Sequence, residues 1–166
     1  MNKKLLQQLY EKYSRELYLY LCSLCHDRAL AEDLLQETFL KAILSLQDNH
    51  TNMRAWLYMV ARNLYFNYAK KESKKIYIEN ENALECEMDE DLLDRMILNE
   101  KKKMLYRALN HLPEKKREIL TMQYFGDLSQ KEIGAVLHIT PENVRVLSCR
   151  AKRELKTYME GKGYDI

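Results

Sequence analysis

Apolar residues recur at the three- and four-residue spacing of an α-helix through the first part of the chain. The first such stripe comprises Leu5, Leu9, Tyr13, Leu17, Leu21, Leu24 and Cys25. It predicts a helix that ends at His26-Asp27, because Asp27 is a suitable N-cap for a following helix. This helix is expected to pack in a bundle, since one of its faces is apolar.

Two more apolar stripes follow the first. Residues 29–46 carry Leu30, Leu34, Leu35, Phe39, Ala42, Ile43 and Leu46 on one side. After a polar loop at 47–53, residues 54–71 place Trp56, Leu57, Val60, Ala61, Leu64 and Tyr68 on one face. Both segments are therefore predicted to be amphipathic helices that pack with the first.

The last of these predicted helices also carries a polar strip. Asn63, Asn67 and Lys70 fall at positions i, i+4 and i+7, so they line one side of the apolar face. Two amides and a cation in a row, beside aromatic residues, can hydrogen-bond and stack nucleic-acid bases. The alternative interpretation is an ordinary solvated helix edge.

Helix boundaries are well marked in the C-terminal part. Pro113 stands in the expected first turn of one helix, and Gly126-Asp127 interrupts that helix. Ser129 and Glu132 then have the spacing of a capping box, which predicts the start of a short helix.

A tight turn at His138-Ile139 is predicted to separate this short helix from a longer one, which starts at the N-cap Thr140 and at Pro141. A short helix, a turn and a longer helix rich in Arg and Lys form a helix-turn-helix pattern. The predicted inward positions are Val144, Leu147, Ala151 and Leu155. The predicted outward positions, toward a DNA major groove, are Asn143, Arg145, Val146, Cys149, Arg150, Lys152 and Arg153.

Charge is unevenly distributed, although the net charge is only +2. Residues 54–75 carry six basic residues and one acid, whereas residues 79–94 carry eight acids and no base. Basic residues return at 101–103. The three blocks predict two small domains, residues 1–72 and 99–166, joined by an acidic flexible linker at 73–98. The helical spacing of apolar residues in both domains predicts an all-α protein. The alternative for the acidic block is a solvated spacer that only improves solubility.

The sequence CSLCH at residues 22–26 matches the attachment site of a c-type haem, and also half of a zinc site. The chain shows no secretory signal and no stretch long enough to span a bilayer, so we expect it in the reducing cytosol. Bacteria attach thioether-linked haem outside that compartment. A structural zinc site takes about four ligands, and Cys86, Cys149 and the other histidines are scattered.

We therefore interpret Cys22 and Cys25 as buried or half-buried helical thiols, and expect no metal and no cofactor. No nucleotide-binding loop and no nucleophile paired with a base are recognisable, so catalysis is not expected either. The alternative is a metal- or redox-responsive protein built around CSLCH.

Nearly the whole chain resembles extracytoplasmic-function (ECF) RNA polymerase sigma factors. The matching segments are AEDLLQETFLKA, RAWLYMVARNL and LPEKKREIL…YFGDLSQKEIGAVLHITPENVRV…RAKREL, in the order that the family has them. The resemblance implies two helical domains, called region 2 and region 4, joined by a linker. Region 2 is expected to grip the clamp of core RNA polymerase and open the promoter −10 element, and region 4 to read the −35 element.

Position by position, the resemblance implies three sets of binding residues. The polymerase set is Asp33, Gln36, Glu37 and Leu40. The −10 set is Asn49, His50, Asn52, Arg62, Asn63, Asn67 and Lys70. The −35 set is Asn143, Arg145, Cys149, Arg150, Lys152 and Arg153. The acidic linker is expected in the RNA-exit path of the polymerase, where negative charge can mimic nucleic acid.

The expected partners are core RNA polymerase, promoter DNA and, as is common in the family, an anti-sigma factor. The expected place of action is the bacterial cytoplasm, at the nucleoid when the protein is in holoenzyme. One alternative is a helix-turn-helix regulator that binds DNA without polymerase. Another is a toxin- or bacteriocin-gene sigma factor of similar layout.

Two positions depart from the family's pattern. His138 replaces the glycine common at the helix-turn-helix turn, where a left-handed backbone costs His less than most residues. Ser148 stands where many relatives have an inward apolar residue, and Leu147 where many have an arginine. An inward stripe shifted by one residue is therefore the alternative for this helix.

Overall fold

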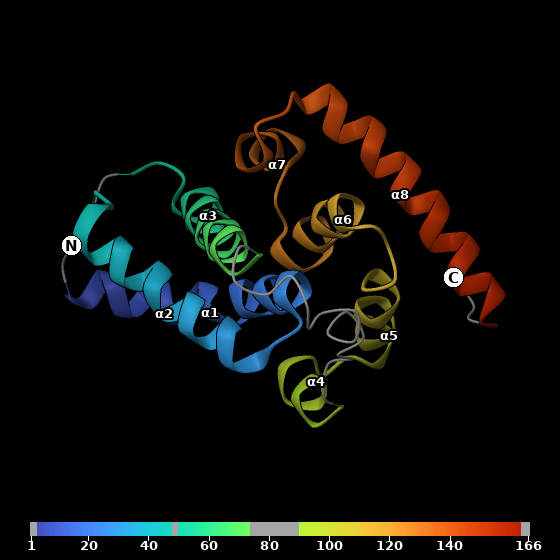
Figure 1. The fold of residues 1–166 in the computed structure, drawn as a ribbon, viewed down its shortest axis with the longest axis horizontal. Helices are drawn as coiled ribbons and strands as arrows, with labels where there is room; N and C mark the ends of the chain where they lie inside the picture. The colour runs from blue at the N-terminus through green and yellow to red at the C-terminus, as the bar shows by residue number, and fades with distance from the viewer. Residues whose placement is uncertain (1–2, 48–49, 74–89, 164–166) are drawn as a thin grey trace. The chain divides into compact units, whose positions relative to one another are not determined.

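The computed structural model describes residues 3–47, 50–73 and 90–163, and their regular structure is helical (Figure 1). The chain divides into two compact units, Met1–Glu87 and Met88–Ile166. The helices of the first are α1 (Lys3–Cys25), α2 (Arg28–Ser45) and α3 (Met53–Ser73). Those of the second are α4 (Glu90–Met96), α5 (Glu100–Leu109), α6 (Glu114–Gly126), α7 (Gln130–Leu137) and α8 (Pro141–Gly161). The predicted all-α fold is confirmed.

In the first unit, each of the three helices packs against both others. Leu17, Leu21 and Leu57 are wholly buried in this unit, and the rings of Tyr20 and Tyr58 have centroids 5.1 Å apart. Burial of a leucine side chain stabilises a fold by about 1.5–3 kcal/mol. This packing fixes the mutual orientation of the helices, so the outward residues of α2 and α3 form defined surfaces.

The helix junctions of this unit follow the local sequence. His26 takes the left-handed conformation with φ 52°, and its N–H donates to the Cys22 carbonyl at 2.9 Å, which ends α1. Asp27 then accepts a hydrogen bond from the Leu30 N–H at 3.2 Å, so the predicted N-cap of α2 is confirmed. At the start of α3, the Arg54 Nε atom lies 3.1 Å from a carboxylate oxygen of Glu16 on α1.

The first four residues of CSLCH occupy the last turn of α1, as the apolar spacing predicted, and His26 follows the helix. Cys22 is buried and Cys25 half-buried, and both thiols are free. Burial raises the pKa of Cys22 to about 12 and that of Cys25 to about 11. Because a metal ion must displace the thiol proton, a raised pKa weakens metal binding at neutral pH. Among the residues that the structure describes, no group of three or more His, Cys, Asp or Glu could hold a metal ion.

Two residues assigned to the apolar stripes face outward instead. Ile43 on α2 is 41% exposed and Tyr68 on α3 is 40% exposed, so their predicted inward positions are wrong. Thr38 takes an inward place on α2 that the apolar pattern could not indicate. Its hydroxyl donates to the Leu34 carbonyl of the same helix at 2.7 Å, which satisfies the buried polar group.

In the second unit, α8 packs against α5, α6 and α7, and it is the longest helix there (orange to red in Figure 1). One part of its core comprises Ala108, Leu109, Leu112, Leu120, Ala151, Leu155 and Met159. The last three of these come from α8. The inner face of α8 is therefore held by the two helices that precede the helix-turn-helix, and by α7 within it.

The capping residues of the helix-turn-helix lie where the sequence predicted them. Ser129 accepts from the Glu132 N–H and Glu132 reaches back to the Ser129 N–H, which completes the capping box of α7. Thr140 accepts from the Asn143 N–H at 3.2 Å and caps α8. Pro113 differs by one position, because it precedes α6 as the N-cap residue.

The inward stripe of α8 corrects one prediction. Ser148 is 3% exposed, together with the buried Val144, Ala151 and Leu155, whereas Leu147 is only half-buried. Leu147 is therefore not the inward residue that the apolar pattern predicted, and the stripe is shifted by one residue at this point. The Ser148 hydroxyl donates to the Gln123 Oε1 atom of α6 at 2.9 Å, so the serine is buried with a partner.

The segment assigned to the linker is described only in part. Residues 74–89 lie outside the described residues, and residues 90–98 include α4. Lys103 of α5 pairs with Asp94 of α4 at 2.5 Å and with Glu100 at 3.0 Å. The domain limits at 72 and 99 stay predictions. No helix in the described part of the chain is long and apolar enough to cross a membrane.

Candidate functional site

The polymerase-binding positions predicted on α2 form one exposed surface. Asp33, Gln36, Glu37 and Leu40 are all exposed. Leu40 is 54% exposed and Leu44, one turn further along, is 76% exposed. These five residues and Ile43 are called the outer face of α2 below. Positions three and four apart lie side by side on a helix, so the leucines and the acids are mixed on this face.

Exposed leucines beside acids are a feature of protein interfaces. The sequence pattern did not predict a role for Leu44 in an interface, because this leucine falls on the polar side of the helix and outside the apolar stripe. The apolar spacing of residues 29–46 predicts an inward Ile43, but the same spacing also fits a position at the border of the outer face. At the flank of α2, the partly exposed Tyr10 ring of α1 packs edge-on against Phe39, with ring centroids 5.0 Å apart.

The loop before α3 is held by two of the predicted −10 residues. The Asn52 N–H donates to the Nδ1 atom of His50 at 3.1 Å, and the Asn52 Oδ1 atom accepts from the Ala55 N–H at 3.1 Å. Both side chains therefore shape the entry to α3, rather than pointing freely into solvent. Asn49, the other predicted loop residue, lies outside the described residues.

On α3, the predicted polar strip is exposed. Asn63, Asn67 and Lys70 all face outward. Beside them, the Arg62 guanidinium lies 4.5 Å from the centre of the Phe66 ring. A cation over an aromatic face at this distance is attracted to it and loses freedom of motion. The i, i+4 spacing of Arg62 and Phe66 is the sequence signal for this contact.

The predicted −35 residues lie on the outward side of α8. Asn143, Arg145, Cys149, Arg150, Lys152 and Arg153 are all exposed. At 3.6 residues per turn, most of this set points away from the buried Ser148 side. Val146, which lies among them, is 41% exposed. The face therefore combines cations, which attract phosphate, with smaller side chains that can approach base edges.

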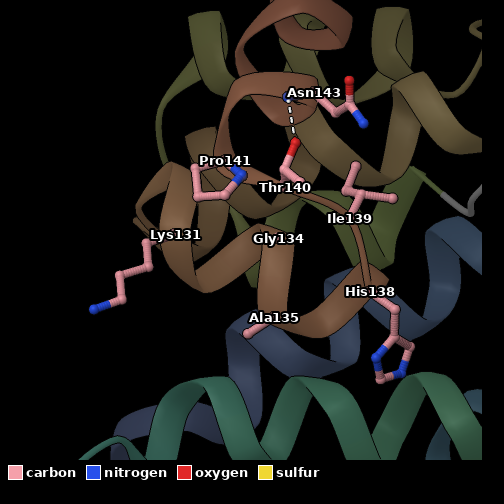
Figure 2. Close-up of a pocket in the computed structure, with 8 residues that line it drawn as sticks. All are labelled: Lys131, Gly134, Ala135, His138, Ile139, Thr140, Pro141 and Asn143. Carbon is pink, nitrogen blue, oxygen red and sulfur yellow. Dashed lines mark hydrogen bonds between the residues drawn. The ribbon is translucent and has the colours of Figure 1, made fainter.

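A pocket lies at the turn between α7 and α8 (Figure 2). The residues that line it are Lys131, Gly134, Ala135, His138, Ile139, Thr140, Pro141 and Asn143. Figure 2 shows Lys131 and His138 on opposite sides, and the Asn143 N–H bonded to the Thr140 hydroxyl. His138 has φ 60° and ψ 43°, so the residue that replaces a glycine takes the left-handed conformation. Gly134 lets the turn approach α7, because a Cβ there would lie 2.6 Å from the Ile139 carbonyl oxygen.

Two family models match the chain, one in each unit. The model described as Sigma-70 region 2 matches residues 9–75, and the model described as Sigma-70, region 4 matches residues 102–155. The predicted −10 and polymerase positions fall within the first match. The predicted −35 positions fall within the second.

Curated relatives match over nearly their full length. The ECF RNA polymerase sigma factor SigM of Bacillus subtilis (strain 168) is 31% identical over 161 residues, which is 91% of this chain and 93% of that protein. The RNA polymerase sigma factor YlaC of the same organism is 30% identical over 161 residues, 93% of this chain and 91% of that protein. The match of both regions does not favour a regulator that works without polymerase.

Among solved structures, the sigma factor RpoE in complex with the anti-sigma factor NepR from Bartonella quintana has the same fold. Its TM-score is 0.69 at 20% identity, with 93% of this chain and 96% of that chain covered. CnrH, solved with the cytosolic domain of CnrY, has a TM-score of 0.66 at 21% identity, with 96% of this chain and 90% of that chain covered. Fold, family models and relatives agree, and the chain belongs to the ECF sigma factors of the sigma-70 family, which bind core RNA polymerase and direct transcription initiation from specific promoters.

Proposed function

We propose that this sigma factor binds its partners through three separate exposed surfaces. The outer face of α2 binds core RNA polymerase, the loop before α3 and the α3 strip bind the −10 element, and the outward side of α8 binds the −35 element. The observation that carries this proposal is the outer face of α2, where Leu40 and Leu44 are 54% and 76% exposed beside two acids.

Polymerase binding would cover apolar area and add charge attraction. The leucines supply area whose removal from water is favourable by about 25 cal/mol per Å². Asp33 and Glu37 are exposed on the same face, and they offer negative charge to basic residues of the polymerase clamp. Charge complementarity of this kind raises the rate of association and selects the orientation of docking.

At the −10 element, we assign different tasks to the loop and the helix. His50 and Asn52 hold the loop backbone through their hydrogen bonds, so a captured base would meet a preset loop. Asn63 and Asn67 are exposed on α3 and can each donate to and accept from a base edge. Lys70 follows one turn later, where a cation favours phosphate.

At the −35 element, α8 acts as the recognition helix of a helix-turn-helix. The residues near the start of such a helix meet base edges, and later ones meet the phosphates. Arg145 is therefore assigned to a base contact, and Arg150 and Lys152 to the phosphates of the DNA. The protein selects promoters by binding alone, and it contributes no catalytic group to the polymerase.

An anti-sigma factor is a further partner in this proposal, because the sigma factor RpoE, which has the same fold, was solved in complex with the anti-sigma factor NepR. The protein acts in the cytoplasm, where RNA polymerase transcribes, and joins the nucleoid as part of holoenzyme.

The test of the α2 assignment reverses its charge. Asp33→Lys combined with Glu37→Lys should weaken binding to core polymerase at least tenfold while helicity by circular dichroism stays unchanged. The matched control, Glu114→Lys with Glu160→Lys, makes the same charge change at exposed acids of the second unit and should leave core binding as it is. Equal affinity of both variants for core polymerase would reject the assignment.

A further inference from the structure

Ser148 is a buried hydroxyl that bonds across to another helix. It is 3% exposed, on the inner side of α8, and it donates to Gln123 Oε1 of α6 at 2.9 Å. Ser23 and Thr38, two buried hydroxyls of the first unit, instead donate to carbonyls of their own helices. A bond within one helix leaves that helix free to rotate, whereas a bond between two helices fixes their relative rotation.

The apolar residues of α8 alone would allow a different rotation. Val144, Ala151, Leu155 and Met159 are buried in any case, and the fifth inward place is open to either Leu147 or Ser148. These two residues differ by about 100° around the helix. Leu147 is the more apolar candidate, so the hydrophobic effect favours turning it inward. In the structure it is half-buried, and Ser148 holds the inward place.

The difference between the two settings is large enough to change DNA reading. Replacing one of five inward residues by a neighbour about 100° away shifts the mean direction of the stripe by about 20°. At the surface of a helix, about 5–6 Å from its axis, this moves a side-chain tip by about 2 Å. A hydrogen bond to a base edge tolerates only a few tenths of an ångström, so a shift of about 2 Å would break it.

We propose that the Ser148–Gln123 hydrogen bond selects the rotational setting of α8, and with it the −35 sequence that this sigma factor reads. Ser148 and Gln123 are positioning residues that act through the outward side of the helix. The inference rests on the proposed role of α8 at the −35 element. It also explains why a serine is accepted at a place where the pattern of the helix calls for an apolar residue.

The inference can be tested by removing one partner of the Ser148–Gln123 hydrogen bond. Gln123→Met deletes the acceptor and leaves the buried Ser148 hydroxyl without its partner, a state that is costly in a packed interior. Ser148 should then turn outward and Leu147 inward. Removing both polar groups, in Gln123→Met with Ser148→Ala, leaves no buried group unsatisfied but also removes the bond, so the more apolar Leu147 should still turn inward. Gln123→Glu keeps an acceptor oxygen and serves as the conservative variant.

The measurement is transcription by core polymerase with each variant on a panel of promoters that differ only in the −35 element. Gln123→Met should change the order in which the promoters rank by transcript yield, and it should lower the yield from the preferred promoter at least tenfold. Gln123→Glu should keep the wild-type order, and the double variant, which lacks the bond, should lose it as Gln123→Met does. Thr157→Ala, which removes an exposed hydroxyl bonded to the Arg153 carbonyl of α8 itself, is the matched control and should change nothing.

A second readout is independent of DNA. If Leu147 turns inward in the Gln123→Met protein, Leu147→Ala should lower Tm by about 4 °C more in that background than in the wild type. That result with an unchanged panel would retain the rotation and reject the role of α8 in −35 reading. If Gln123→Met lowers output equally on every promoter and shows no added effect of Leu147→Ala, the inference is overturned, because Ser148 has then taken a carbonyl of its own helix.

Discussion

Burial governs the chemistry of Cys22 in the last turn of α1. It raises the pKa of the thiol from 9.0 to about 12, and the neighbouring Cys25 thiol adds to the rise. Between about pH 9 and pH 12 the unfolded chain releases a proton that the folded chain retains. The contribution of this thiol to stability is therefore complete below about pH 9 and is lost as the pH rises toward 12.

Replacing Cys22 should accordingly change how stability responds to alkali. We expect the free energy of unfolding of Cys22→Ala to fall less steeply than that of the wild type between pH 9 and pH 12, by about 1–3 kcal/mol over the window. Urea unfolding at a series of pH values measures the difference. Cys149→Ala, at an exposed thiol, provides the control and should run parallel to the wild type. Parallel curves for both variants would mean that the Cys22 thiol ionises as freely in the folded state as in the unfolded state.

Gly134 illustrates a residue fixed by backbone packing. A Cβ atom at this position would lie 2.6 Å from the Ile139 carbonyl oxygen, and main chain cannot move aside as a long side chain can. We expect Gly134→Ala to lower the free energy of unfolding by about 1–3 kcal/mol, through overpacking at the turn of the helix-turn-helix. Thermal unfolding measures the change.

A second glycine of the same unit provides the control for Gly134→Ala. Gly161 ends α8, and a Cβ atom there would meet nothing within 4 Å. Gly161→Ala should be neutral or stabilising by up to about 1 kcal/mol, because alanine restricts the unfolded chain. A Gly134→Ala protein as stable as Gly161→Ala would show that the turn relaxes without cost.

Individual caps were predictable from sequence, whereas individual burials were not. Asp27, Ser129 and Thr140 accept hydrogen bonds from N–H groups three residues away, so a short window of sequence contains the whole interaction. The burial of Ser148 depends on Gln123, which is 25 residues distant. Nothing in the local pattern of α8 indicates that partner.

At the scale of the element, α8 is expected to separate base reading from phosphate binding along its length. Arg145→Ala should reduce discrimination among −35 sequences by about 1–3 kcal/mol if the guanidinium makes a bidentate contact to guanine. Lys152→Ala should weaken binding evenly on all sequences and reduce the slope of log affinity against log salt by about one unit. Affinity measured on several −35 sequences and at several salt concentrations distinguishes the two effects.

One result would contradict the assignment of Arg145 to a base contact. If Arg145→Ala weakens binding by the same factor on every −35 sequence, its guanidinium binds phosphate and the base-reading residues lie elsewhere on the helix. Lys156→Ala, at an exposed position one turn beyond Lys152, is the matched control for loss of one positive charge, and it should have a smaller effect on the salt slope.

The helices themselves were well predicted because their information is periodic. The spacing of apolar residues and the end signals gave α1, α2, α3 and α6 to α8, since both signals repeat or stand close in sequence. The rotation of a helix is harder to predict, because residues at the border of an apolar face can turn either way. Ile43, Tyr68 and Leu147 are such border residues, and packing against neighbouring helices decides their burial.

For the whole molecule, the placement of the site residues follows from the two-unit organisation. The predicted polymerase and −10 residues that the structure describes belong to α2, α3 and the loop between them, and the −35 residues to α8. The spacing within each helix could be read from the sequence. An exposed strip of Asn and Lys has the same sequence pattern in a DNA-binding helix and in an ordinary solvated helix. The assignment of each surface to a partner therefore depended on the resemblance to a family.

This organisation predicts that DNA reading can be blocked without loss of polymerase binding. Cys149 is an exposed thiol among the cations of α8, whereas burial holds the pKa of Cys22 at about 12 and that of Cys25 at about 11. At pH 8 a thiol with a pKa of about 11 is about 0.1% thiolate, so it reacts slowly. In a Cys86→Ser background, N-ethylmaleimide should therefore modify Cys149 first.

The modified protein should bind core polymerase with unchanged affinity, since the outer face of α2 belongs to the other unit. Its output from promoters that depend on the −35 element should fall at least tenfold, because a bulky neutral group stands between α8 and the base edges. Cys149→Ser in the same background is the control, and treatment should not alter its output. Mass spectrometry confirms the site of modification, and core pull-down and run-off transcription give the two readouts. Loss of core binding after modification of Cys149 alone would mean that α8 contributes to the polymerase interface, and that the two units do not divide the work as proposed.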